Sequence, residues 1–183
     1  MSSGTDSVGS KSREQLLRAA WLRHDAMWFQ YVAGKCGMDT VNQANRAIVE
    51  KLGQFEMLNL LRCLQHSARI ENVDELLQLF SLAIDIYQAH HSPVRLERID
   101  DKTFRVSMSN CWACKAVELA GWLDQYQCGP WGRLKGWLSA LKLNSTLNPD
   151  PTLCLEYLGI NKGRLCTVMV VVDSFSRERM CSG

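Results

Sequence analysis

The chain has 183 residues, of which 46% are hydrophobic and 22% charged, so it is long enough to bury the core of one ordinary globular domain. Its 21 basic and 19 acidic residues nearly cancel, which excludes the one-signed field that draws a protein to nucleic acid or an anionic membrane. No apolar run approaches the ~20 residues of a membrane span, and the N-terminus lacks a basic-then-apolar signal segment. We therefore expect a cytoplasmic protein that binds neither nucleic acid nor membrane.

The N-terminal half of the chain is predicted to be helical. Residues 1–12 are rich in Ser and Gly and predict a disordered tail, whereas residues 13–183 predict a single domain. Helical periodicity predicts helices over 13–37, 40–66 and 73–91, the last with Asn72 as its cap and Glu75 in a capping box. The apolar stripe that we expect to face the core from the first helix comprises Leu17, Trp21, Met27, Trp28, Tyr31 and Val32.

The pattern changes to a period of two after Pro93. The segments 94–100 and 103–108 alternate apolar and polar residues around a turn, which is typical of a hairpin. Two short helices follow, over 109–120 and 130–143, and the segments 152–159 and 164–172 predict a second hairpin around the sequence INKG. The predicted fold class is α+β, with N-terminal helices packed on an antiparallel sheet made of the two hairpins.

Three of the eight cysteines lie in the segment SNCWACKAVELAGWLDQYQCGPWG, residues 109–132. A cap at Ser109 or Asn110 would place Cys111 and Cys114 in the first turn of a helix, and Pro130 would leave Cys128 just before the next helix. Helix N-termini favour the thiolate, which is the form that binds metal. Cys154, on a predicted strand with Glu156, is the candidate for a further ligand.

The same cysteines also fit simpler interpretations. From the spacing alone, a metal site and core packing are equally supported, because a lone C-x-x-C is weaker than the paired knuckles of most zinc sites. A redox pair ranks third, since the motif follows an antiparallel hairpin rather than a βαβ unit. The remaining cysteines are predicted to be core or tail thiols: Cys36, Cys63, Cys166 and Cys181.

Other side chains are weaker candidates for a site. His24 and Asp25 would reach a pocket mouth together with Trp28, although a solvated surface pair is the simpler interpretation. His90 and His91 are best explained as cations at a helix end. The six tryptophans are predicted to pack in the core, with Trp112 and Trp131 lining the site.

The cysteine register resembles that of a family of uncharacterised bacterial and archaeal proteins. The residues that match are Cys111, Ala116, Gly121, Cys128, the NPDP turn at 148–151, Cys154-Leu-Glu-Tyr, and the segment HDAMWF at 24–29. The same skeleton is similar to the L-2-amino-thiazoline-4-carboxylic acid hydrolase family and, more distantly, to 4-vinyl reductase-type domains. The resemblance implies Cys111, Cys128 and Cys154 as the site cysteines. Cys114 departs from the family pattern, as does Asn148, where the family has proline.

Two functions follow as hypotheses. The first is a metal-dependent hydrolase of a small heterocyclic or amidine-like substrate, in which Cys111, Cys128 and Cys154 hold zinc and Asp25 or Glu156 acts as base. The second is a small-ligand binding or sensing module in which a structural zinc or an iron–sulfur cluster has Cys114 as its fourth ligand. Either function expects a small-molecule partner, and a homo-oligomer is compatible with both.

Overall fold

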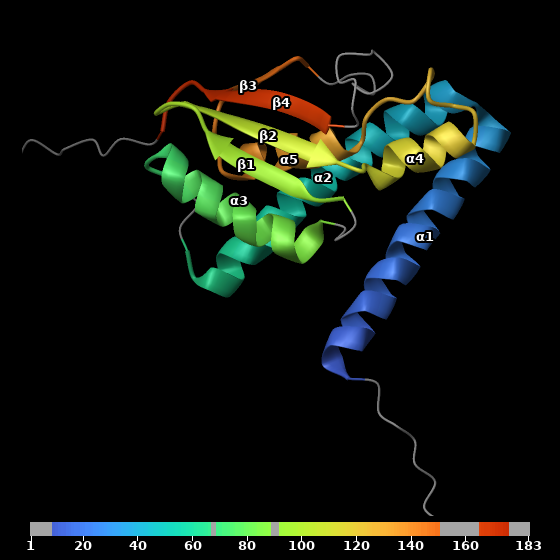
Figure 1. Ribbon diagram of the computed structural model, residues 1–183, viewed down its shortest axis with the longest axis horizontal. Coiled ribbons are helices and arrows are strands. Elements are labelled where there is room, and N and C mark those ends of the chain that lie inside the picture. The colour runs from blue at the N-terminus through green and yellow to red at the C-terminus, as the bar shows by residue number, and fades with distance from the viewer. Residues whose placement is uncertain (1–8, 67–68, 89–91, 151–164, 176–183) are drawn as a thin grey trace, which may run out of the picture.

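The computed structural model describes residues 9–66, 69–88, 92–150 and 165–175. Three helices come first, and two short helices lie between the strands (Figure 1). The helices are α1 (Ser10–Cys36), α2 (Met38–Leu64), α3 (Val73–Tyr87), α4 (Trp112–Leu119) and α5 (Pro130–Ala140). The strands are β1 (Val94–Arg98), β2 (Thr103–Ser109), β3 (Ser145–Asn148) and β4 (Leu165–Val172). In this part of the chain, no helix is long and apolar enough to cross a membrane.

The strands form one antiparallel sheet in the order β1-β2-β4-β3, which confirms the predicted α+β class. Pairing of β2 with β4 joins the two hairpins, with Val106 opposite Val168 and Met108 opposite Cys166. Alternate residues of β4 are buried, because successive side chains on a strand point to opposite faces. Cys166 therefore shares the inward face with Val168 and Val170.

One strand of the second hairpin differs from the prediction within the described residues. β3 at 145–148 pairs with the C-terminal half of β4, although the sequence there was expected to be a connection. Four residues are too few for alternation to distinguish a strand from a loop, so partner pairing decides their structure. The predicted strand over 152–159 lies outside the described residues.

Helices α2 and α5 pack against each other at unusually short range, because glycines lie at their crossing. A Cβ atom at Gly53 would lie 2.4 Å from the carbonyl oxygen of Arg133, and one at Gly136 would lie 2.2 Å from that of Glu50. Only hydrogen is small enough at both positions. This close crossing fixes the start of α5, and with it the residues just before that helix.

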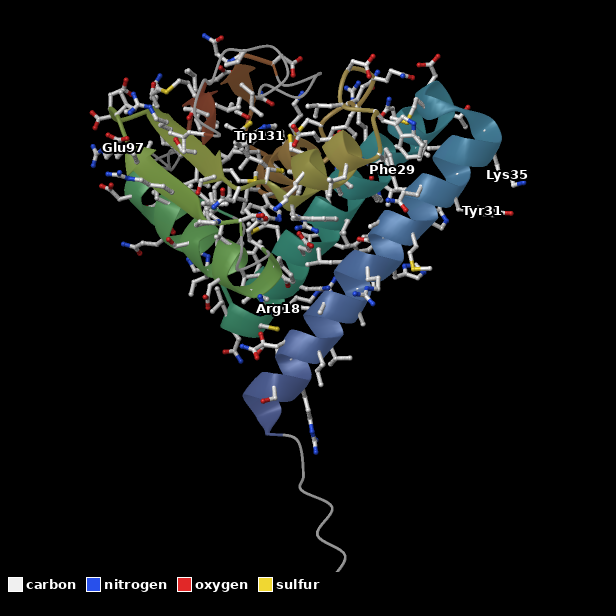
Figure 2. All side chains as sticks on the ribbon, turned by 45° about the vertical axis from the view of Figure 1, so that its right-hand side comes forward. Arg18, Phe29, Tyr31, Lys35, Glu97 and Trp131 are labelled. Carbon is white, nitrogen blue, oxygen red and sulfur yellow. The ribbon has the colours of Figure 1, made fainter. Side chains whose placement is uncertain are left out.

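Helix α1 projects away from the rest of the molecule at its N-terminal end (Figure 1). Its inward positions are partly buried or buried, and they recur at helical spacing: Arg18, Leu22, Asp25, Phe29 and Ala33. Figure 2 shows Arg18 and Phe29 pointing toward the body and Tyr31 and Lys35 pointing away from it. Arg18 donates through Nη1 to the carbonyl oxygen of Asp85 at 3.2 Å, which ties α1 to the end of α3.

The predicted core stripe of α1 is therefore largely wrong. Of its six members, only Val32 packs against the core. The other five are exposed: Leu17, Trp21, Met27, Trp28 and Tyr31. Periodicity identifies the apolar side of a helix but does not show whether another element covers it. Here the covered side is a neighbouring stripe that includes two charged residues.

Candidate functional site: an aromatic groove beside a cysteine cluster

A groove of about 420 Å³ lies between α1, α2, α4 and the segment that leads into α5. Its walls are mainly apolar, and aromatic side chains come from three separate parts of the chain: Trp21, Trp28 and Phe29, then Trp112, and then Trp122 and Tyr126. The volume lies in the range of ordinary small-molecule pockets, which is ~300–1,000 Å³. This groove is the strongest candidate binding site in the part of the chain that the structure describes.

The ionisable side chains that α1 contributes to the groove are the His24–Asp25 pair. Nδ1 of His24 lies 3.6 Å from Oδ1 of Asp25, and both residues line the groove. Asp25 is on the inward stripe of α1, with Trp21 one turn before it and Trp28 one turn after it. The pair thus lines the groove, and it is also solvated, because the side chains of His24 and Asp25 are 74% and 45% exposed.

The basic residue that lines the groove, Arg133, is held by an internal ion pair. Its Nε lies 3.2 Å from Oε2 of Glu56, outside hydrogen-bond geometry, and its Nη1 donates to the carbonyl oxygen of Tyr87 at 3.2 Å. Glu56 also accepts a hydrogen bond of 3.0 Å from Nε1 of Trp137. Burial raises the pKa of Glu56, while Arg133 and the Trp137 hydrogen bond oppose that rise. The charge of Arg133 is thus largely balanced within the protein.

The segment before α5 is fixed by Asn42, which is buried on α2. Its Nδ2 donates to the carbonyl oxygen of Gln125 at 2.7 Å, and its Oδ1 accepts from the backbone N–H of Gln127 at 3.1 Å. Between these two anchors, Tyr126 turns inward and meets Phe29 edge to face, with ring centroids 5.8 Å apart. The segment therefore closes the groove at the C-terminal half of α1.

Two of the predicted ligands, Cys111 and Cys128, lie near each other and are both buried. The pKa of the Cys128 thiol is raised mainly by burial, and also by the neighbouring Cys111 and Cys166, whereas the backbone N–H of Trp131 lowers it. Nε1 of Trp131 donates to Sγ of Cys166 at 3.3 Å. Cys111 and Cys166 thus both act electrostatically on Cys128, and we refer to the three buried thiols as the cysteine cluster, although within the described residues they do not form a metal site.

Cys166 was predicted to be a core or tail thiol, and it is indeed buried in the core, but its place beside Cys128 was not predicted. The signal that could have found it is the alternation of β4, which places Cys166 on the same face as Val168 and at the end of the strand nearest β2's C-terminus. Trp112 and Trp131 were predicted to line the cysteine site. Trp131 is buried and donates to Cys166, and its backbone N–H also acts on Cys128, whereas Trp112 lines the groove.

Cys114 is buried and disulfide-bonded. This differs from the expectation that every cysteine is reduced. A metal ligand must be a thiolate, so Cys114 can bind a metal only after the disulfide is reduced. Two further predicted site residues, Cys154 and Glu156, lie outside the described residues. Within 9–66, 69–88, 92–150 and 165–175, no three His, Cys, Asp or Glu side chains are gathered as a metal site.

The predicted cap of α4 is wrong, and the actual cap comes from a distant residue. Asn110 has φ of 51°, which is the left-handed region that an N-cap does not adopt, and Cys111 is the N-cap. Oγ of Ser92 accepts from the backbone N–H of Trp112 at 3.1 Å and donates to the carbonyl oxygen of Asn110 at 2.8 Å. Ser92 thus positions both Cys111 and the groove residue Trp112. By contrast, Pro130 begins α5 as predicted.

Comparison with known proteins assigns the chain to no family, because neither a family model nor a curated protein matches it. The likeness to the hydrolase family therefore stays a prediction.

Proposed function

We propose that this chain is a binding protein for a small, largely apolar molecule, with the groove between α1, α2 and α4 as its site. The observation that supports this proposal is the groove itself, about 420 Å³ in volume and walled by aromatic residues from several elements. Apolar walls with a few polar groups are typical of small-molecule sites. The proposal places the protein in the cytoplasm, where reducing conditions would open the Cys114 disulfide.

A groove-filling substitution tests this function. Ala116 lines the groove from α4, so Ala116→Trp places an indole in the space that the ligand would occupy. Leu119 lies on the same helix, is 81% exposed and does not line the groove, which makes Leu119→Trp the matched control. The measurement is titration with the neutral fluorophore N-phenyl-1-naphthylamine. We expect the wild type and Leu119→Trp to bind the fluorophore and Ala116→Trp to lose this binding. Equal binding by both variants would contradict the proposal.

A second candidate is the zinc-dependent hydrolase of a small heterocyclic or amidine-like substrate. One observation favours it: Cys111 and Cys128, which come from separate elements, are electrostatic neighbours. They would be two of the ligands, with Cys154 as the third. Zinc, when bound with an open position, lowers the pKa of its water to about 7. Asp25 lines the groove and would accept a proton there, as would Glu156 in the alternative assignment. An iron–sulfur cluster is the competing cofactor.

Metal content per chain and an absorption spectrum of purified protein test this second candidate. Zinc is colourless, whereas an iron–sulfur cluster absorbs visible light. If Cys111, Cys128 and Cys154 are the ligands, Cys128→Ser loses the metal and Cys114→Ser retains it. Equal loss in both variants would support the four-thiolate site instead. Protein that binds no metal after loading under reducing conditions would exclude both cofactors.

A further inference from the structure

In the described part of the chain, the groove is lined by one acidic and one basic side chain, and they differ in how far other protein groups neutralise their charges. Among the described residues lining it, Asp25 is the acidic side chain and Arg133 the basic one. Arg133 is balanced by Glu56 at 3.2 Å and by the carbonyl oxygen of Tyr87. Among the described residues, the ion-pair partner of Asp25 is His24, whose Nδ1 is 3.6 Å away and whose imidazole is charged only when protonated. A net negative charge therefore faces the groove at α1.

Tryptophan side chains line the groove beside this carboxylate. Trp21 and Trp28 flank Asp25 on α1 at spacings of four and three residues, so all three lie on one side of the helix. Trp21 is 57% exposed and Trp28 is 43% exposed, so their rings remain accessible to a ligand. Trp112 lines the groove from α4. Aromatic faces attract cations, and tryptophan does so most strongly.

We infer that the ligand of the groove is an organic cation: an amine or quaternary ammonium group on an apolar or aromatic body. The cationic nitrogen lies at Asp25 between Trp21 and Trp28, and the apolar body extends toward α4. This inference rests on the proposed binding function and specifies its ligand class. The negative charge of Asp25 and the aromatic rings of the neighbouring tryptophans both attract a weakly hydrated organic cation. An anion would be repelled by Asp25, and the charge of Arg133 is already paired with Glu56.

A pair of probes that differ in one atom tests the inference. Phenyltrimethylammonium and tert-butylbenzene have nearly the same shape, but the first has N⁺ where the second has a neutral carbon. Their affinities for the full chain are measured by equilibrium dialysis. We expect the cation to bind about tenfold more tightly, which corresponds to the ~1.4 kcal/mol within the range of cation–π and charge contributions. Benzenesulfonate, the anionic probe, should bind more weakly than either.

Variants then assign the preference to its residues. Asp25→Asn should lower the affinity for the cation about fivefold, the upper end for a partly exposed charge pair, and leave tert-butylbenzene within about twofold. Asp39→Asn is the control, because Asp39 is exposed in the first turn of α2 and does not line the groove. Trp28→Leu should also reduce the preference for the cation. Circular dichroism confirms that each variant is folded.

The results distinguish a failure of the cation assignment from a failure of the proposed binding function. Equal affinity of the two probes for the wild type would overturn the cation assignment while leaving the groove as a binding site. An undiminished cation preference in Asp25→Asn would likewise overturn it. Binding of none of the three probes, together with no binding of the neutral fluorophore, would refute the proposed function and this inference with it.

Discussion

Replacing Gly136 by alanine should push α2 and α5 apart. The new Cβ would lie 2.2 Å from the carbonyl oxygen of Glu50, 2.9 Å from the backbone nitrogen of Gln54 and 3.0 Å from Cα of Gly53. All three are backbone atoms, so no side chain can rotate out of the way. In a close-packed interior, relief requires the helices to separate by roughly 1 Å.

The magnitude follows from two opposing effects. Overpacking by one methyl group costs typically 1–3 kcal/mol, and the backbone contacts place Gly136→Ala near the upper end, at about 3 kcal/mol. Alanine also stabilises the helix by about 1 kcal/mol relative to glycine, because its helix propensity is higher. The expected net loss is therefore about 2 kcal/mol in the free energy of unfolding, or a decrease in Tm of about 4–8 °C for a chain of this size.

Gly132→Ala is the matched control on the same helix. Its Cβ would meet its nearest atom, the carbonyl oxygen of Arg46, at 3.7 Å, which is an ordinary van der Waals contact. This variant should be unchanged or up to about 1 kcal/mol more stable. Urea unfolding and thermal unfolding of both variants give the comparison. If Gly136→Ala proved as stable as Gly132→Ala, the close crossing of α2 and α5 would be refuted.

Three further predictions concern a helix cap, a buried thiol and the attachment of α1. Asn72→Ala removes the side chain that accepts from the backbone N–H of Glu75 at 2.9 Å, and it should lower the free energy of unfolding by about 1 kcal/mol in a urea titration. The pKa of Cys128 is raised by burial above the ordinary value of 9.0, so the unfolded chain releases this proton first. Stability should therefore be retained below about pH 9 and fall as the pH rises, and Cys128→Ala should make that fall shallower; an unchanged slope would contradict the shift. Arg18→Ala removes hydrogen bonds to the end of α3 and should speed amide hydrogen exchange in α1 while leaving α5 unaffected, whereas equal exchange in wild type and variant would mean that this anchor is dispensable.

Local sequence determined the kind and order of most elements. The change from helical to alternating periodicity predicted the α+β class, and Pro130 predicted the start of α5, because proline suits the first helical position. Asn72 with Glu75 predicted the start of α3, because an Asn side chain can accept the backbone N–H three residues on. Each of these signals acts between residues that are neighbours in the chain.

Tertiary structure decided which faces are covered and which distant residues meet. Trp28 and Asp25 occupy adjacent positions on the turns of α1, yet only the packing of that helix against α2 makes them walls of one groove with residues of α4. Ser92 replaces the expected cap of α4, and Cys166 joins Cys128 from a strand that follows it by 38 positions in the sequence. These contacts depend on the sheet register and on the close crossing of α2 and α5. No local pattern specifies either, because both are set by pairings between segments far apart in the chain.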